Sequence, residues 1–178
     1  MAIVQGDYVY LRPYEMDDID IVLAGANEPV GARLTGTHGG GFTREQIERY
    51  IQMNIDAEMG SRYGWVICRT EDDTVVGEVV INEVDNDNHN ASIRIALYDP
   101  KYFGKGYGTA AMRQAIDYVF RNSDLHRISL GVYAFNPRAI HVYEKVGFTL
   151  EGTLRDTLYW DGEYHDEYVM SILRTDWH

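Results

Sequence analysis

The sequence has little of what marks secreted, membrane or metal-binding proteins. Cys68 is the single cysteine in 178 residues, which excludes an internal disulfide framework and fits a reducing compartment. No cluster of cysteine and histidine has the spacing of a zinc site, so we expect no metal. No apolar run reaches 18 residues, and the N-terminal MAIVQGDYVYLRP lacks the basic and apolar regions of a signal peptide. These absences predict a cytoplasmic protein with no membrane partner.

Basic residues are also scarce. The chain has 16 Lys and Arg against 28 Asp and Glu, a formal net charge of −12. Phosphate backbones are bound by basic surfaces, so this balance argues against nucleic acid as a partner and favours cationic or neutral solutes. The alternative, that the charge only aids solubility, stays open. With 45% hydrophobic and 25% charged residues, the chain has the composition of one globular domain over 1–178.

Hydrophobic periodicity and turn residues predict the order of the elements. A capping-box pattern, Thr43 with Gln46, marks the start of one helix, and Asp161-Gly162 marks a hairpin. Short polar turns between successive strands indicate antiparallel neighbours. The expected order is a strand at 8–13, a helix at 17–23, a glycine-rich loop at 29–42, a helix from 43 towards 60, strands at 63–70, 74–84 and 90–98, a glycine-rich turn and long helix to 120, a strand at 127–134, a helix at 137–146, and strands at 148–160 and 164–173.

The glycine-rich turn precedes the long helix in LYDPKYFGKGYGTAAMRQAIDYVF, residues 97–120. Gly104, Gly106 and Gly108 leave backbone N–H groups accessible at the first turn of a helix, an arrangement that binds phosphate. A P-loop is excluded because Lys105 is followed by glycine and tyrosine rather than Ser or Thr. A dinucleotide site needs a carboxylate on the next strand, and HRISLGVYAFN has none. The turn is therefore predicted to bind a pyrophosphate through its backbone.

A second motif follows in NPRAIHVYEKVGF, residues 136–148. Asn136 is a good N-cap, Pro137 suits the first helical position, and Gly147 suits the residue after the last turn. A short helix over 137–146 is thus well bounded, with Tyr143 on its apolar face. A tyrosine in that position alone would be read as core, so its value depends on the neighbouring motif.

Together the turn and the spacing N-x-x-A-x-x-x-Y-x-x-x-G-F resemble the GNAT acetyltransferase superfamily. The opening LRP, the DPKYFGKGYGT turn and the closing EGTLRDTLYWDGEYHDEYVMSIL are similar to its ribosomal-protein N-acetyltransferase (RimJ/RimL-like) branch, which also resembles the polyamine (spermidine) N-acetyltransferases. The resemblance covers nearly the whole chain. It implies an α/β (α+β) fold with a mixed, mainly antiparallel central sheet of about seven strands flanked by about four helices.

The resemblance implies an acetyl-CoA-dependent N-acetyltransferase acting on a primary amine by direct attack. Tyr143 would be the general acid for the thiolate. A bulge in the strand before the turn would free main-chain groups for the pantetheine arm. Lys145 is predicted either to reach a CoA phosphate or to favour the helix dipole. The residues implied to bind acetyl-CoA are Ala96, Leu97, Tyr98, Phe103, Gly104, Lys105, Gly106, Tyr107, Gly108, Thr109, Asn136, Ala139 and Lys145.

Two positions depart from the superfamily pattern. Phe103 stands where the turn usually begins with Gln or Arg, and Ser92, Ile93 and Arg94 stand where many relatives carry a Glu. The usual base is therefore absent, and the proton could leave through water. Candidates for the acceptor side are Glu78, Glu83 and His38, with His165 on the last hairpin. The acidic residues expected to flank a cationic acceptor are Glu78, Glu83, Asp85, Asp166 and Glu167.

The acceptor itself stays open at this point. A polyamine, an aminoglycoside-like cation and a protein N-terminus all fit a small-molecule or N-terminal amine partner. Two alternatives from other classes are a non-catalytic acyl-CoA-binding module and a nucleotide-binding α/β domain. The sequence does not fix the oligomeric state, for which a homodimer or higher homo-oligomer is one option.

Overall fold

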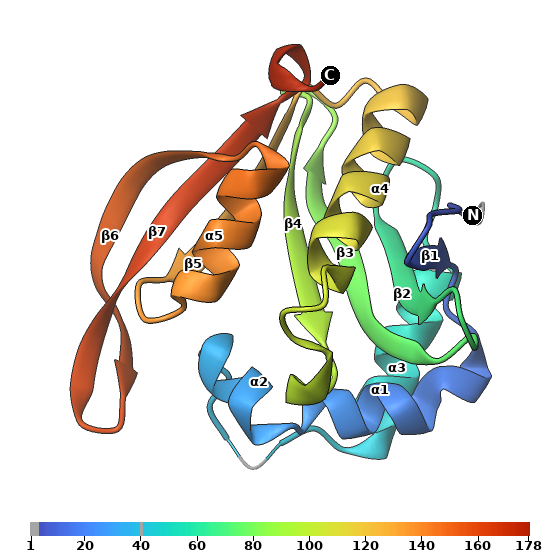
Figure 1. Cartoon of the computed structure of the whole chain (residues 1–178), viewed down its shortest axis with the longest axis horizontal. Coiled ribbons are helices and arrows are strands. Elements are labelled where there is room, and N and C mark those ends of the chain that lie inside the picture. Colours follow the sequence, from blue (N-terminus) through green and yellow to red (C-terminus); the bar gives the residue numbers. More distant parts are fainter. Residues whose placement is uncertain (1–3, 40) are drawn as a thin grey trace.

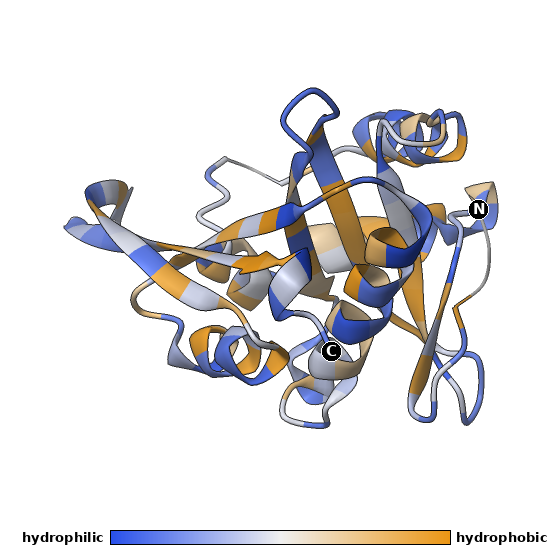
Figure 2. Ribbon diagram, turned by 90° about the horizontal axis from the view of Figure 1, so that it is seen from above, coloured by the Kyte–Doolittle hydropathy of each residue, from blue (hydrophilic) through white to orange (hydrophobic). Residues whose placement is uncertain are grey.

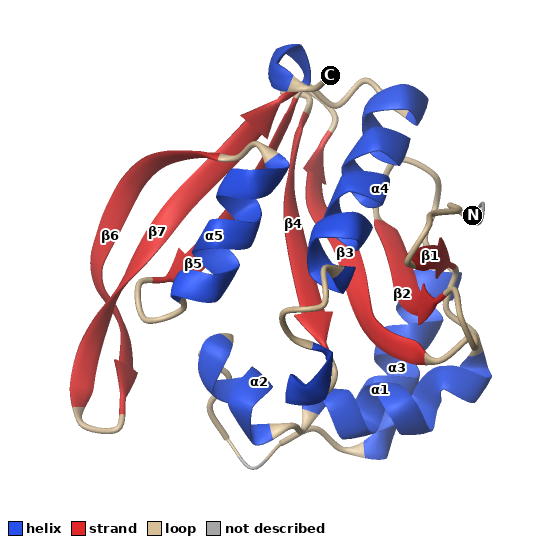
Figure 3. Ribbon diagram, in the orientation of Figure 1, coloured by secondary structure: helices blue, strands red, loops and turns tan. Residues whose placement is uncertain are grey.

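The fold is built on one seven-stranded sheet. The computed structural model describes residues 4–39 and 41–178, and its strands follow the order β1-β2-β3-β4-β5-β7-β6 (Figure 3). All neighbours are antiparallel except β4 and β5, which are parallel. This is the mixed, mainly antiparallel sheet that the sequence predicts. The strands are β1 (Val9–Arg12), β2 (Tyr63–Arg69), β3 (Val75–Asp85), β4 (Asn90–Leu97), β5 (Arg127–Tyr133), β6 (Thr149–Trp160) and β7 (Glu163–Leu173).

Helices cover both faces of the sheet. Helices α4 (Tyr107–Asn122) and α5 (Pro137–Val146) lie on one face, here called the α4 face. Helices α1 (Ile19–Ala26) and α3 (Arg44–Ile55) cover the other, the α3 face, while α2 (Pro29–Leu34) lies below the ends of β4 and β5 (Figure 1). A capping box between Thr43 and Gln46 starts α3, as the sequence predicts.

Each face has its own hydrophobic core. Met112, Ala115 and Ile116 of α4 are fully buried against the sheet, because helical spacing puts them on one side. On the α3 face, Ile47 and Ile51 of α3 pack on Val66 of β2. Figure 2 shows the hydrophobic residues concentrated in the central strands and the hydrophilic ones on the outer turns. No helix of the described residues is long and apolar enough to cross a membrane.

The parallel pair β4 and β5 stays together for only three residue pairs. Asn90 to Ser92 pair with Arg127 to Ser129, and beyond Ser92 the two strands diverge towards their C-terminal ends (Figure 1). Strand β5 continues in register with β7 down to the Tyr133 and Glu167 pair, and β4 continues with β3. Each strand therefore keeps one partner while its inner edge becomes available to a ligand.

Two details of the sequence prediction need correction. The stretch 29–42 is not all loop, because α2 occupies its first part, starting at Pro29 with its Gly31 N–H donating to the Glu28 carboxylate at 2.6 Å. The described residues thus hold five α-helices. The implied bulge in β4 is also wrong. Pairing of β3 with β4 is regular along that stretch, and the irregularity lies on β3 between Asn82 and Asp85.

Gly77 of β3 tests how tightly β3 and β4 are packed. A Cβ added at Gly77 would lie 2.2 Å from the backbone oxygen of Ala96, which cannot move without disturbing the strand. We expect Gly77→Ala to lower the free energy of unfolding by about 2 kcal/mol, as overpacking does. The matched control is Gly152→Ala in β6, where an added Cβ meets nothing within 4 Å. Denaturant unfolding of both variants measures the difference, and equal stabilities would contradict the close contact.

Candidate active site

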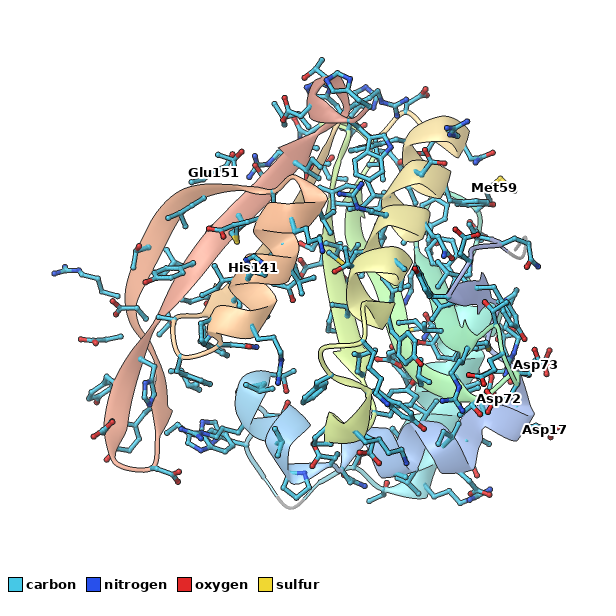
Figure 4. All side chains as sticks on the ribbon, viewed as in Figure 1. Asp17, Met59, Asp72, Asp73, His141 and Glu151 are labelled. Atoms are coloured by element: carbon cyan, nitrogen blue, oxygen red, sulfur yellow. The ribbon has the colours of Figure 1, made fainter. Side chains whose placement is uncertain are left out.

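A cavity of about 730 Å³ opens where β4 and β5 diverge. Its size is that of a small-molecule site. Its walls come from both strands, the glycine-rich turn before α4, helix α5, strand β7 and the C-terminal end of α2. Two predicted motifs that are distant in sequence therefore meet in one cavity. His141 of α5, labelled in Figure 4, also lines it.

The glycine-rich turn forms one end of the cavity. Gly104 and Gly106 have φ of 72° and 83°, in the left-handed region that glycine adopts without strain. An added Cβ at either residue would meet no atom within 4 Å, so glycine is required by the backbone conformation and the space above it is open. Gly106 is the N-cap of α4, whose first N–H groups and dipole favour an anion. This geometry fits the pyrophosphate group that the sequence predicts.

A cation that sequence reasoning missed lies beside this turn. Arg138, in the first turn of α5, lines the cavity and places its guanidinium 3.9 Å from the ring centroid of Phe103. Phe103 occupies the position where the superfamily usually has Gln or Arg. Through this cation–π contact, helix α5 supplies a positive charge next to the turn position that Phe103 occupies. Only the tertiary fold brings α5 to the turn, and the sequence offers no local signal for it.

Tyr143 lines the cavity from α5. Its ring packs at 6.1 Å from that of Phe148, and its hydroxyl makes no hydrogen bond within the described part of the chain. Burial raises the pKa of Tyr143 to about 12. The hydroxyl is therefore protonated across the neutral range and can donate to a ligand atom. Asn136 starts the same helix, with its side-chain oxygen accepting from the Ala139 N–H at 3.2 Å.

Most residues implied to bind acetyl-CoA are brought together here. Two are not part of the lining. Lys105 lies on the turn but outside the cavity wall, and the Tyr98 N–H donates to the Val76 carbonyl at 2.9 Å. The side chain of Tyr98 points to the α3 face. The predicted residues that line the cavity are Ala96, Leu97, Phe103, Gly104, Gly106, Tyr107, Gly108, Thr109, Asn136, Ala139, Tyr143 and Lys145.

Glu78 lies outside the cavity in a buried polar cluster on the α3 face. Its side chain is 6% exposed and accepts hydrogen bonds from the hydroxyls of Tyr14 and Tyr98, both at 2.8 Å. Arg94 pairs with the same carboxylate at 3.0 Å and donates to the Tyr50 hydroxyl at 2.7 Å. Burial and the charge of Glu78 raise the pKa of Tyr14 and Tyr98, so both remain donors. Glu78 thus serves to hold Arg94, which does line the cavity.

The remaining acceptor-side candidates separate into two groups. Glu83 lines the cavity, where it accepts a hydrogen bond from Ser92 at 2.6 Å, and Glu167 of β7 lines it as well. By contrast, Asp85 accepts from the Asn88 N–H in a turn, and Asp166 accepts from the Asp156 N–H in the hairpin. His38 and His165 are also outside the lining. His38 stacks on Trp160, with 4.7 Å between ring centroids.

Comparison with known proteins identifies the family. Residues 9–149 match the family model described as an acetyltransferase (GNAT) domain. The chain belongs to the GNAT acetyltransferases. It is 34% identical over 171 residues to the spermidine N(1)-acetyltransferase of Escherichia coli (strain K12), covering 93% of this chain and 86% of that protein. Acetyltransferases of this family take the acetyl group from acetyl-CoA, the co-substrate that the resemblance implies.

Solved structures of GNAT enzymes share this fold. The spermidine N-acetyltransferase from Vibrio cholerae, in complex with CoA and spermine, superposes with a TM-score of 0.86 at 25% identity, covering 97% of this chain and 99% of that one. The ribosomal-protein-S5-alanine acetyltransferase from Vibrio fischeri superposes with a TM-score of 0.85 at 21% identity, covering 100% of both chains. At this identity the similarity is one of fold. This GNAT chain is therefore an acyltransferase with the mixed sheet that the sequence predicts.

The glycine-rich turn can be tested through Gly106. We expect Gly106→Val to raise the Kd for acetyl-CoA at least about tenfold, because a β-branched residue is strained at positive φ and its side chain occupies the phosphate approach. Isothermal titration calorimetry measures the affinity. Gly60→Val is the matched control, since Gly60 has φ of 86°, equally open surroundings and a place outside the cavity. Equal affinity of both variants would place the pyrophosphate elsewhere.

Proposed function

We propose that this chain is an acetyl-CoA-dependent N-acetyltransferase that acetylates a primary amine of a small polycation, with Tyr143 as general acid. The observation that carries the proposal is one cavity, at the divergence of β4 and β5, that joins the glycine-rich turn to the Tyr143 hydroxyl. We further propose that residues 1–178 act as one N-acetyltransferase domain.

Acetyl-CoA would lie along the gap between the two strands. The pyrophosphate would bind the N–H groups of the turn at Gly104 to Gly108, where the α4 dipole and the Arg138 guanidinium add favourable charge. The pantetheine amides would pair with the inner edge of β4 beyond Ser92, which has no strand partner within the described chain. Lys145, also in the lining, would favour a phosphate.

The chemistry needs an amine held in line with the thioester and a proton donor for sulfur. The Tyr143 hydroxyl is available for that second task, because no hydrogen bond to the described residues competes for it. With a pKa of about 12 it stays protonated through the neutral and mildly alkaline range, in which part of the acceptor amine is neutral. Tyr143 would hold its proton towards the departing sulfur and regain one from solvent.

The acceptor site favours a cation. Glu83 and Glu167 line the cavity, whereas the positive charge of Arg94 is balanced by Glu78. Carboxylates in a concave site steer a polycation and bind its ammonium groups. The spermidine acetyltransferase relatives act on acceptors of this chemistry by name. A polyamine such as spermidine is therefore the acceptor class favoured both by the cavity carboxylates and by the similarity to spermidine acetyltransferases.

The role of Tyr143 is tested by removing its hydroxyl alone. We expect Tyr143→Phe to lower kcat by roughly 10²-fold or more, as the loss of a general acid does, with acetyl-CoA affinity nearly unchanged. The control is Tyr118→Phe on α4, a tyrosine packed on the core outside the cavity. Release of free CoA thiol measures the rate. A kcat within about twofold of the parent would make Tyr143 a packing residue.

The cationic acceptor is tested by salt. We expect kcat/KM for spermidine to fall as salt is raised, because the field of the cavity carboxylates is screened over about 10 Å at 0.1 M ionic strength. The kcat/KM for a neutral amino acid should hardly change with salt. Spermidine, an aminoglycoside, a basic N-terminal peptide and a neutral amino acid are assayed side by side at low and moderate salt. A preference for the neutral amino acid without salt dependence would reject the polycation.

A further inference from the structure

One carboxylate in the cavity lies against a glycine on the neighbouring strand. Glu167 of β7 pairs with Tyr133 of β5, and its side chain lies across Gly131. A Cβ on residue 131 would be 1.9 Å from the Glu167 Oε1 atom, so no other residue leaves room for the carboxylate there. Glycine weakens the interior of a strand, and here it permits a close approach. Gly131 thus leaves the room that the Glu167 carboxylate occupies.

That position is at the point where β4 and β5 have just parted. Ser92 pairs with Ser129, and if both strands ran on in register Arg94 would stand opposite Gly131. No pairing of β4 with β5 extends that far in the described chain, and both residues line the cavity instead. Glu167 therefore lies beside the gap in which the thioester would be held.

Glu167 and Tyr143 approach this gap from opposite faces of the sheet. Leu130 and Val132 of β5 are buried in the α4-face core, so Gly131 and Tyr133 point to the α3 face by strand alternation. Glu167, paired with Tyr133, shares that face, whereas Tyr143 belongs to α5 on the α4 face. Burial and then the charge of Glu167 raise the pKa of Tyr133, consistent with a carboxylate beside its hydroxyl.

Glu167 is also the cavity carboxylate whose oxygens are uncommitted. Glu83 already accepts from Ser92 at 2.6 Å, and Glu78, behind the cavity wall, is taken by Arg94 and by tyrosines. No hydrogen bond or ion pair joins the Glu167 carboxylate to another residue that the structure describes. Strand β4 offers no carboxylate between Asn90 and Leu97 that could serve in its place.

We propose that Glu167 binds the acceptor ammonium and accepts the proton that its nitrogen loses during acetyl transfer. The bound ammonium first gives one proton to solvent, and the lone pair freed on the nitrogen forms the C–N bond to the acetyl carbonyl carbon as the C–S bond breaks. The nitrogen proton passes to a Glu167 oxygen, and the sulfur takes a proton from the Tyr143 hydroxyl. Both side chains then exchange protons with solvent, so the net reaction is amine and thioester to amide and thiol. This assignment rests on the proposed function and adds the catalytic base to it.

The test replaces Glu167 by Gln, which keeps the size and removes the basic oxygen. We expect Glu167→Gln to lower kcat/KM for spermidine by about 10²-fold or more and to leave the Kd for acetyl-CoA within about twofold. The charged residues that line the cavity with Glu167 are Glu83, Arg94, Arg138 and Lys145, and Tyr133 lies beside it. All are retained in the variant. Glu163→Gln, exposed on the same strand and outside the cavity, should match the parent.

A pH series separates a base from a structural residue. The ratio of parent to Glu167→Gln kcat/KM should fall from pH 7 to pH 9.5. At the higher pH more of the acceptor amine binds in its neutral form, and hydroxide can take the remaining proton. A structural role would leave the ratio of the two rates constant. A variant that loses acetyl-CoA affinity and melting temperature together with its rate, or that stays within about twofold of the parent, would overturn the proposal.

Binding without turnover separates this proposal from the proposed function. Spermidine is titrated by calorimetry into parent and variant saturated with CoA, where no acetyl transfer occurs. We expect the variant to bind spermidine at least about tenfold more weakly. If the parent turns over no amine yet this difference remains, the proposed function fails and the amine site at Glu167 stands. If the parent turns over spermidine and Glu167→Gln matches it in binding and rate, the proposed function stands and the role of Glu167 is rejected.

Discussion

The site depends on how briefly two parallel strands stay paired. Three residue pairs join β4 to β5, and beyond them each strand keeps only its outer partner, β3 or β7. Unpaired backbone groups away from water are costly, so an inner edge of this kind is stable next to a ligand that offers amides of its own. The same divergence opens the gap to both faces of the sheet, and Glu167 and Tyr143 line it from opposite faces.

Local chemistry made the ends of this gap predictable from sequence. The turn with Gly104 and Gly106 and the helix after it need only a positive φ and a helix N-terminus, both of which are encoded within a few residues. Asn136 and Gly147 bound α5 by the same kind of local rule, with Asn136 capping the helix as its residue type predicts. Once the ends of α5 are known, helical spacing places Tyr143 on its apolar face.

The sequence could not resolve features that depend on the other faces of the sheet. Strand alternation places side chains on one face or the other, but it does not show that Glu78 is enclosed by tyrosines while Glu83 lines the cavity. The meeting of Arg138 with Phe103 is set by the packing of α5 near the turn. Helix α2 escaped detection because it is six residues long and capped by Glu28, which is not a favoured N-cap type.

The buried pairing of Glu78 with Arg94 limits how acceptor preference can be redesigned. Arg94 looks like an independent cavity residue, since its side chain is 45% exposed, yet its charge is what compensates an almost fully buried carboxylate. Replacing Arg94 alone would leave that carboxylate uncompensated in a low-dielectric setting, and the fold would bear the penalty. Libraries that vary the charge of this wall therefore need to treat the two positions as one unit, with neutral residues introduced at both together.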